Sequence, residues 1–289
     1  MGTVIMFNSQ TLSFSRFAVL AAFLVGTAGS CFAGSQTFEQ AKSEGVTIAI
    51  ANEPPYAFMG ADGSPTGAGP ELDKEILREA GITHFSGAVM EYGAMIPAVQ
   101  SKRATFASVG SLLITPERCQ AVIFSEPLIC DGLAFILPNA LASKIKNFKD
   151  IAAAGLKVGV CGGCVEQKLA LEAGNSAEKV VVYPDGTSGM KLLADGRIDV
   201  FAYSSIGGAD LYDRLADQEK FKYAGVVDFP FSCQGAAFNE EDVELRDAYN
   251  KGIDAIRKSG KYMEILKKFN MEEAAIGLDT VNTQLLCNR

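Results

Sequence analysis

The chain has 289 residues, of which 48% are hydrophobic, so it is long enough for one large core or two smaller ones. Its formal net charge of -8 argues against nucleic acid and anionic membrane surfaces as partners, because both are negatively charged. Because His84 is the single histidine, most His-based catalytic triads and zinc sites are excluded.

The first 33 residues have the three-part layout of a secretory signal. Arg16 precedes an apolar run at 17–26, and the small-residue stretch GTAGSCFA follows it. The run is shorter than the ~20 residues that cross a bilayer. We expect cleavage after Ala33 and export to the periplasm. Two alternatives are lipid attachment at Cys31, whose AGSC context loosely resembles a lipoprotein box, and a buried first helix.

Strand and helix patterns alternate along the rest of the chain, after a stretch at 34–46 that we expect to be a mobile lead. Apolar runs predict strands at 46–51, 84–90, 104–110, 121–124, 156–161, 179–184, 198–203 and 231–238. Helical spacing of apolar residues predicts helices at 70–81, 94–102, 165–174, 188–196, 204–217, 240–260 and 261–269. A turn is expected at 115–118, and a linker with a short helix at 137–155.

This alternation predicts an α/β fold with mainly parallel strands. The pattern runs through two rounds, which indicates two lobes. In such sheets a ligand lies beyond the carboxyl ends of the strands. Residues 53–56, Tyr92 and the motif CGGC at 161–164 all follow predicted strands, so they are the candidate site.

The CGGC motif has three interpretations. It can be a thiol redox centre at a helix N-terminus, a local disulfide, or a glycine-rich loop whose backbone N–H groups face an anion. Its two glycines favour the loop, and the absence of a second CxxC argues against a four-cysteine metal site. After export six cysteines remain, and an oxidising compartment favours disulfides between them.

Other residues near the predicted strand ends suit a zwitterion. Glu53 with Tyr56 and Tyr92 offers Coulomb attraction and aromatic faces to an organic cation. Arg118 can hold a carboxylate through two parallel hydrogen bonds. The alternatives are an ordinary polar loop around Glu53 and a surface salt bridge for Arg118.

Several segments together resemble the polar amino-acid-binding family of periplasmic solute-binding proteins, which serve ABC importers. They are EYGAMIPAVQSKR, LLITPER, IFSEPL, LKVGV, SGMKLLADGRIDVFAY and ELRDAYNKGIDAIRKSGKYMEILKKF, between residues 44 and 270. Within that family the most similar group is the ectoine and hydroxyectoine binders. The segments that carry this closer resemblance are IAIANEPPYAFMGADG, EYGAMIP, TPERC, LALEAG and PDGTSGMKLLADGRIDV.

The resemblance implies a two-lobed α/β periplasmic binding protein fold of type II. Lobe 1 would be discontinuous, with residues 34–132 and 233–289, and lobe 2 would be residues 133–232. Two hinge crossovers would lie near 131–136 and 229–234. It also implies a monomer that serves a membrane permease, without enzymatic activity, cofactor, metal or nucleic acid.

The resemblance also implies a role for each site residue. Arg118 would bind the carboxylate of a small zwitterion such as ectoine, and Glu53 its cationic ring nitrogens. Tyr56 and Tyr92 would be walls of an aromatic cage. The loop that closes over the ligand carboxylate from lobe 2 would consist of Gly163, Cys164, Val165 and Glu166.

The sequence departs from the ectoine pattern at several positions. Leu113 stands where a third cage aromatic is usual, a loss of ~1 kcal/mol of cation–π contact. Val165 replaces a threonine, Cys161 and Cys164 replace Pro and Gly, and the chain is one residue longer between 103 and 116. A polar amino acid or betaine-like solute therefore stays an alternative, as does a dehydratase-like enzyme using Glu53 or Glu166.

The same resemblance places Cys130 and Cys233 on neighbouring crossovers. They are expected to form a disulfide, with Cys119 and Cys287 tying down the tail. The alternative pairing is Cys233 with Cys287 and Cys119 with Cys130.

Overall fold

The computed structural model describes residues 1–2, 38–229 and 231–288. The expected signal segment, with Cys31 and the cleavage site, therefore lies outside the described residues apart from its first two. Among the described residues, none of the helices is long and apolar enough to span a membrane. Helix α1 occupies Phe38–Glu44, so the expectation of a mobile lead is wrong there, because Ala41 packs fully buried in the core.

The first sheet has the strand order β4-β1-β5-β14-β6. Its strand β1 (Val46–Ile50) pairs in parallel with β4 (Phe85–Val89) and β5 (Phe106–Ala107). Strand β14 (Ala237–Phe238) pairs antiparallel with β5 and with β6 (Ile123–Phe124). A segment near the end of the chain thus completes a sheet begun near its start.

The second sheet has the order β10-β9-β11-β8-β12. Strand β9 (Val158–Cys161) pairs in parallel with β10 (Val180–Tyr183) and β11 (Val200–Ser204). Strand β8 (Leu133–Pro138) pairs antiparallel with β11 and with β12 (Phe221–Gly225). In each sheet four of the five strands run in the same direction, which confirms the expectation of mainly parallel strands. One strand runs against the rest, so two of the four pairings in each sheet are antiparallel.

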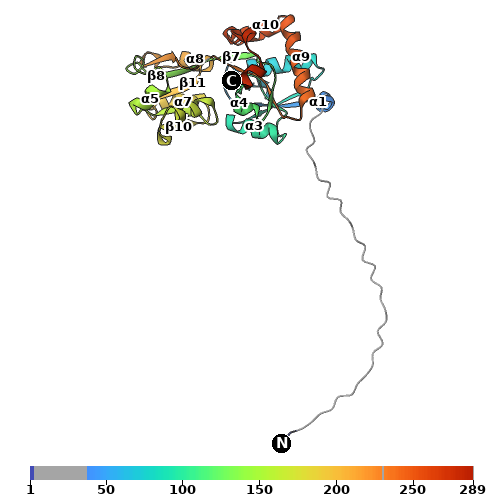
Figure 1. Cartoon of the computed structure of the whole chain (residues 1–289), viewed down its shortest axis with the longest axis horizontal. Helices are drawn as coiled ribbons and strands as arrows, with labels where there is room; N and C mark the ends of the chain where they lie inside the picture. Colours follow the sequence, from blue (N-terminus) through green and yellow to red (C-terminus); the bar gives the residue numbers. More distant parts are fainter. Residues whose placement is uncertain (3–37, 230, 289) are drawn as a thin grey trace, which may run out of the picture. The chain divides into compact units, whose positions relative to one another are not determined.

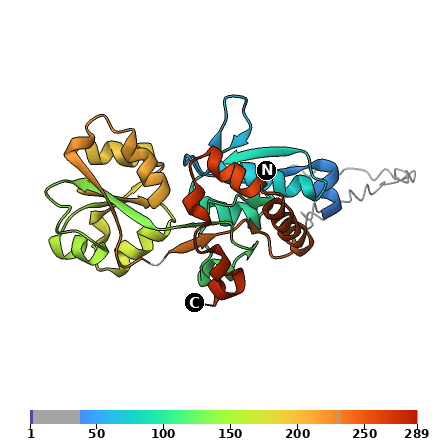
Figure 2. The same cartoon turned by 90° about the horizontal axis from the view of Figure 1, so that it is seen from above.

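Helices pack on both sheets, and Figures 1 and 2 show α5, α7 and α8 grouped with strands of the second sheet. Those packed around the first sheet are α2 (Ala68–Glu79), α3 (Tyr92–Gln100), α9 (Val243–Lys258) and α10 (Lys261–Lys268). Those packed around the second are α5 (Phe148–Ala154), α6 (Val165–Glu172), α7 (Gly186–Ala194) and α8 (Ser205–Asp213). The shorter elements are the β2–β3 hairpin (Phe58–Met59 and Pro65–Thr66), α4 (Pro116–Cys119) and α11 (Thr283–Cys287).

The two sheets are joined through a pair of short strands. Strand β7 (Ile129–Asp131) pairs antiparallel with β13 (Ser232–Gln234), so the expected neighbouring crossovers are present. The stretch 231–238, expected to be one strand, divides into β13 and β14. Gly235 packs at the break, where a Cβ would lie only 2.9 Å from the Ser125 carbonyl oxygen. The lobe boundaries at 132/133 and 232/233 stay a prediction.

Three disulfides cross-link the chain. Cys130–Cys233 joins β7 to β13, and Cys119–Cys287 joins α4 to α11. This confirms the first of the two pairings and contradicts its alternative. The third disulfide, Cys161–Cys164, closes the CGGC loop on itself.

A buried carboxylate fixes the loop that follows β5. Asp73 of α2 accepts hydrogen bonds from the Ser108 hydroxyl, from the Val109 N–H at 3.3 Å and from the Tyr249 hydroxyl of α9 at 2.5 Å. Burial raises the pKa of Asp73 to about 7. Because these bonds anchor the loop to two helices, the residues just after it, 110–113, are held in place beside the candidate site.

Candidate ligand-binding site

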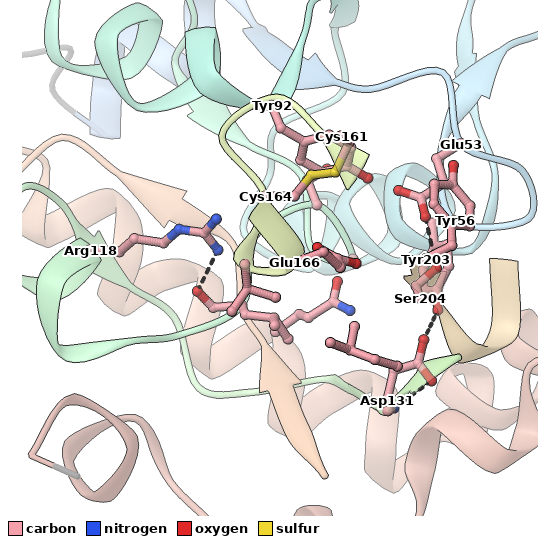
Figure 3. A pocket seen from close by; sticks show the side chains of 17 residues that line it. Glu53, Tyr56, Tyr92, Arg118, Asp131, Cys161, Cys164, Glu166, Tyr203 and Ser204 are labelled. Atoms are coloured by element: carbon pink, nitrogen blue, oxygen red, sulfur yellow. Dashed lines mark hydrogen bonds between the residues drawn. A yellow bond between two sulfur atoms is a disulfide. The ribbon is translucent and has the colours of Figure 1, made fainter. Parts of the chain in front are cut away.

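A cavity of about 50 Å³ lies where segments of both sheets meet. Eight of the nine residues predicted for the site line it, and the ninth, Gly163, contacts one of the eight. Figure 3 shows Arg118 on one side, Glu53 and Tyr56 on the other, and Glu166 between them. The sequence therefore identified most of the lining.

Glu53 lies in the turn that follows β1. Its backbone pairs with Ala57 through two hydrogen bonds of 2.8 and 3.0 Å, which hold the turn closed. Its carboxylate is buried and accepts a hydrogen bond of 2.8 Å from the Ser204 hydroxyl at the end of β11. Burial is the main cause that raises the pKa of Glu53 to about 8. This group therefore changes charge near neutral pH and will respond to a cation placed beside it.

Tyr56 is held by an acid that the sequence did not single out. Its hydroxyl donates to a carboxylate oxygen of Asp131, at the end of β7. Asp131 also accepts from the Ser205 hydroxyl and from the N–H groups of Gly132 at 2.7 Å and Ile206 at 3.3 Å. Burial raises the pKa of Asp131, and its hydrogen bonds oppose that shift. Asp131 thereby orients the Tyr56 ring and joins it to α8.

Arg118 belongs to α4, whose N-cap Thr115 accepts a hydrogen bond of 3.3 Å from the Arg118 N–H. One guanidinium nitrogen, Nη1, donates to the Leu113 carbonyl at 3.0 Å, and Nη2 donates to the Gly163 carbonyl at 3.2 Å. Burial lowers the pKa of Arg118, while nearby Glu166 opposes that shift. A guanidinium has five N–H donors, so donors beyond these two are available to a ligand carboxylate.

The CGGC loop runs from the end of β9 to the N-cap of α6. Gly163 has φ +78° and lies against α3, where a Cβ would come within 2.6 Å of the Gly93 Cα. Only glycine fits this left-handed backbone at so close an approach. The Gly163 N–H also donates to the Gln167 side chain at 2.9 Å. The disulfide, Gln167 and Arg118 thus all restrain the same loop.

Glu166, in the first turn of α6, is the most unusual group in the cavity. Its side chain is buried, and burial raises its pKa to about 7 although Arg118 attracts its charge. Within the described part of the chain, no other residue donates a hydrogen bond to this carboxylate. One of its oxygens lies within 4.8 Å of the sulfurs of Cys161 and Cys164.

The cavity also contains polar and aromatic groups that the sequence did not predict. Among the described residues, Ser111 Oγ and Gln234 Oε1 are buried in its lining without hydrogen-bond partners. Tyr203, near the end of β11, lines it as well and so adds an aromatic side chain. The one signal that could have found Asp131, Tyr203 and Ser204 is their position at the carboxyl ends of strands.

The chain belongs to the bacterial extracellular solute-binding proteins, family 3, whose model matches residues 46–272. It is 26% identical over 291 residues to the probable amino-acid ABC transporter periplasmic-binding protein y4tE of Sinorhizobium fredii, covering 97% of this chain and 95% of that protein. The solved structure of EhuB in complex with hydroxyectoine is 38% identical, with a TM-score of 0.81, covering 88% of this chain and 98% of that one. An ancestral arginine-binding protein bound to arginine is 27% identical, with a TM-score of 0.68, covering 78% and 97%.

Proposed function

We propose that this chain is the periplasmic receptor of an ABC importer and captures a small zwitterion of the ectoine class. The observation that carries the proposal is a single cavity with the Arg118 guanidinium on one side and the Glu53 carboxylate with Tyr56 on the other. The 38% identity to the hydroxyectoine complex of EhuB supports the solute class. The solute lies between lobe 1, residues 34–132 and 233–289, and lobe 2, residues 133–232.

Each charged group of the solute has a matching partner in this arrangement. Arg118 binds the solute carboxylate with its remaining N–H donors, since a guanidinium and a carboxylate match in shape and charge. Glu53 faces the delocalised cation, and the rings of Tyr56, Tyr92 and Tyr203 provide aromatic contact with it. The unpartnered oxygen atoms of Ser111 and Gln234 accept further N–H groups.

The solute enters when the lobes separate around β7 and β13. A cavity of about 50 Å³ holds a few water molecules, which is too little for a ring compound in the arrangement described. Three contacts that hold that arrangement closed are the hydrogen bonds of Arg118 to Gly163 and of Ser204 to Glu53, and the exposed ion pair of Lys168 in α6 with Glu117 in α4. Closure around the solute then creates the form that a permease recognises.

The proposal includes no chemical change of the solute. Glu53 and Glu166 are the carboxyl groups in the cavity that titrate near neutral pH, and here they serve binding by meeting positive charge. The name of the Sinorhizobium fredii relative, a probable ABC transporter periplasmic-binding protein, supports this choice. Incubation of the protein with ectoine, followed by analysis of the solution for a product, checks it: the solute is expected back unchanged.

A thermal-shift screen tests the solute class. The purified protein, unfolded and refolded to remove bound solute, is heated with ectoine, hydroxyectoine, glycine betaine or arginine. The melting temperature is expected to rise most with ectoine or hydroxyectoine, because a solute that binds the native state and not the unfolded state stabilises the native state. A rise with arginine alone would assign the cavity to a basic amino acid instead.

A further inference from the structure

We propose that Cys161, Cys164 and Glu166 form a binding site for a thiophilic divalent cation, such as Zn²⁺, once the disulfide between the two cysteines is reduced. The inference concerns the wall of the solute cavity, but it does not depend on which solute binds there. It rests on the position of three ligand atoms and on the state of one carboxylate.

The three ligand atoms are already gathered. The sulfurs of Cys161 and Cys164 and one oxygen of Glu166 lie within 4.8 Å of one another, and the three side chains are buried. The Cα atoms of the two cysteines are 5.4 Å apart. A CxxC pair is a usual spacing for two zinc thiolates, and a carboxylate is a common third ligand. Once the covalent bond between them is broken, the two sulfurs are close enough to bind the same ion.

The Glu166 carboxylate provides the second, independent observation. It is 5% exposed, points into the cavity in Figure 3, and within the described ranges accepts a hydrogen bond from its own backbone N–H but from no other residue. Burying a carboxylate in this way is costly unless a positive group meets it. Its location beside the two sulfurs, rather than in contact with Arg118, makes a cation bound by those sulfurs a suitable partner.

The loop around the cysteines fits this role too. Gly162 and Gly163 separate the two cysteines, and the side-chain oxygen of Gln167 accepts a hydrogen bond from the Gly163 N–H. The main chain of the loop therefore stays restrained when the covalent bond between the sulfurs is opened. With three protein ligands, a tetrahedral ion keeps its fourth position for water or for a carboxylate from the solute cavity.

The chemistry balances with a dithiol as reductant. The dithiol gives two electrons and two protons to the Cys161–Cys164 bond, which yields two thiols, and the dithiol closes to its own disulfide. Binding of the cation then displaces the two thiol protons to solvent, so that two thiolates and the Glu166 carboxylate face a charge of +2. The oxidised protein cannot offer these thiolates.

Cadmium titration of the whole exported protein tests the proposal, because the ultraviolet charge-transfer band between thiolate and Cd²⁺ reports sulfur coordination directly. The protein is reduced with a dithiol, freed of reductant without air, and titrated with Cd²⁺; Zn²⁺ is then added as competitor. The variant Cys161→Ser/Cys164→Ser, treated identically, is the blank for the other four cysteines. The expected result is one equivalent of Cd²⁺ above this blank, displaced by Zn²⁺ and missing in the unreduced protein.

Variants at Glu166 separate a chelate from a simple dithiol. Glu166→Gln is expected to weaken Cd²⁺ binding by about tenfold or more, since it removes an anionic ligand, whereas Glu166→Asp keeps a carboxylate and retains more of the affinity. Circular dichroism verifies that both variants fold. A titration equal to the blank, or equal affinity in Glu166→Gln and the parent protein, would overturn the proposal. Solute binding is measured separately on the oxidised protein, so its failure is distinguishable from the failure of the metal site.

Discussion

Arg118 and Gly163 are joined directly, by a hydrogen bond of 3.2 Å from the guanidinium Nη2 to the main-chain oxygen. Arg118 stands in α4, which lies between β5 and β6 of the first sheet in the chain, and Gly163 lies in the loop that follows β9 of the second. The group proposed to bind the solute carboxylate therefore also links the two halves of the site. Solute capture and closure of the site depend on the same side chain.

Arg118→Ala is expected to lower solute affinity by at least about a hundredfold, because it removes a charge-assisted pair and a link between the halves. Calorimetric titration measures this change. The matched control is Arg214→Ala, which removes an exposed arginine paired with Asp210 on α8 and should leave the affinity unchanged. Equal affinity in both variants would remove Arg118 from the site.

Solute affinity is expected to rise with pH up to about pH 8. The pKa of Glu53 is raised to about 8, so below that pH the carboxyl is protonated and must lose its proton to meet a cation. Affinity then falls by up to about tenfold for each pH unit below the pKa. Calorimetric titration in buffers that differ in their enthalpy of ionisation measures how many protons are released when the solute binds. Glu53→Gln should bind more weakly and release fewer protons, and a pH-independent affinity in the parent protein would contradict this account.

The same carboxyls make the solute-free protein less stable as pH rises. Glu53 and Glu166 have folded-state pKa values of about 8 and 7, above the ordinary value of 4.5. At pH values between the ordinary pKa of 4.5 and the raised folded-state pKa values, the folded state binds more protons than the unfolded state. The free energy of unfolding therefore decreases as pH increases from about 5 to 8. Thermal unfolding measured across this range checks the sign. The decrease should be smaller in Glu53→Gln.

Two of the disulfides are expected to have different effects. Cys161→Ser/Cys164→Ser removes one of the three restraints on the loop that carries Gly163, so solute affinity should fall by about three- to tenfold, because preorganisation of the loop is reduced. Cys119→Ser/Cys287→Ser opens a bridge across 168 residues of sequence and should cost about 2–5 kcal/mol of stability with little effect on affinity. Paired calorimetry and thermal unfolding on both double variants separate the two. Identical affinities for both would show that the loop disulfide does not position the site.

Leu113→Phe is expected to strengthen binding of an ectoine-class solute. An added aromatic wall beside the solute cation contributes ~1 kcal/mol, or about fivefold in affinity. Leu113 lines the cavity, and only its carbonyl, which the substitution keeps, bonds to Arg118. Titration of the variant with ectoine gives the result, and weaker binding would show that an aromatic ring at position 113 does not contact the solute cation.

The sequence predicted the strands and helices that are long and apolar, such as β1, β9 and α9, and missed those that lack such a pattern. Strand β12 contains Lys222 and is only partly buried, so its composition does not distinguish it from a loop. Strands β5 and β14 lie within the predicted strands 104–110 and 231–238, but each has only two residues, and the two pair across more than a hundred residues of sequence. Such pairings arise from tertiary packing, which the local spacing of apolar residues does not predict.

The candidate site shows the same division. Glu53, Tyr56 and Tyr92 were found because they follow strand ends, Arg118 because it adjoins a short helical turn, and all four match a family pattern and line the cavity. Asp131 and the unpartnered Gln234 were missed because both lie in the short crossover strands, where neither periodicity nor motif marks a polar side chain as buried. Only the three-dimensional pairing of β7 and β13 brings them to the cavity.

The most direct measurement is a calorimetric titration of refolded, solute-free protein with ectoine and hydroxyectoine, with arginine as the comparison. Saturable binding of an ectoine-type solute at one site is expected, lost in Arg118→Ala and kept in Arg214→Ala. No heat and no thermal shift with either ectoine compound, or tighter binding of arginine, would contradict the proposed solute class while leaving the family assignment in place.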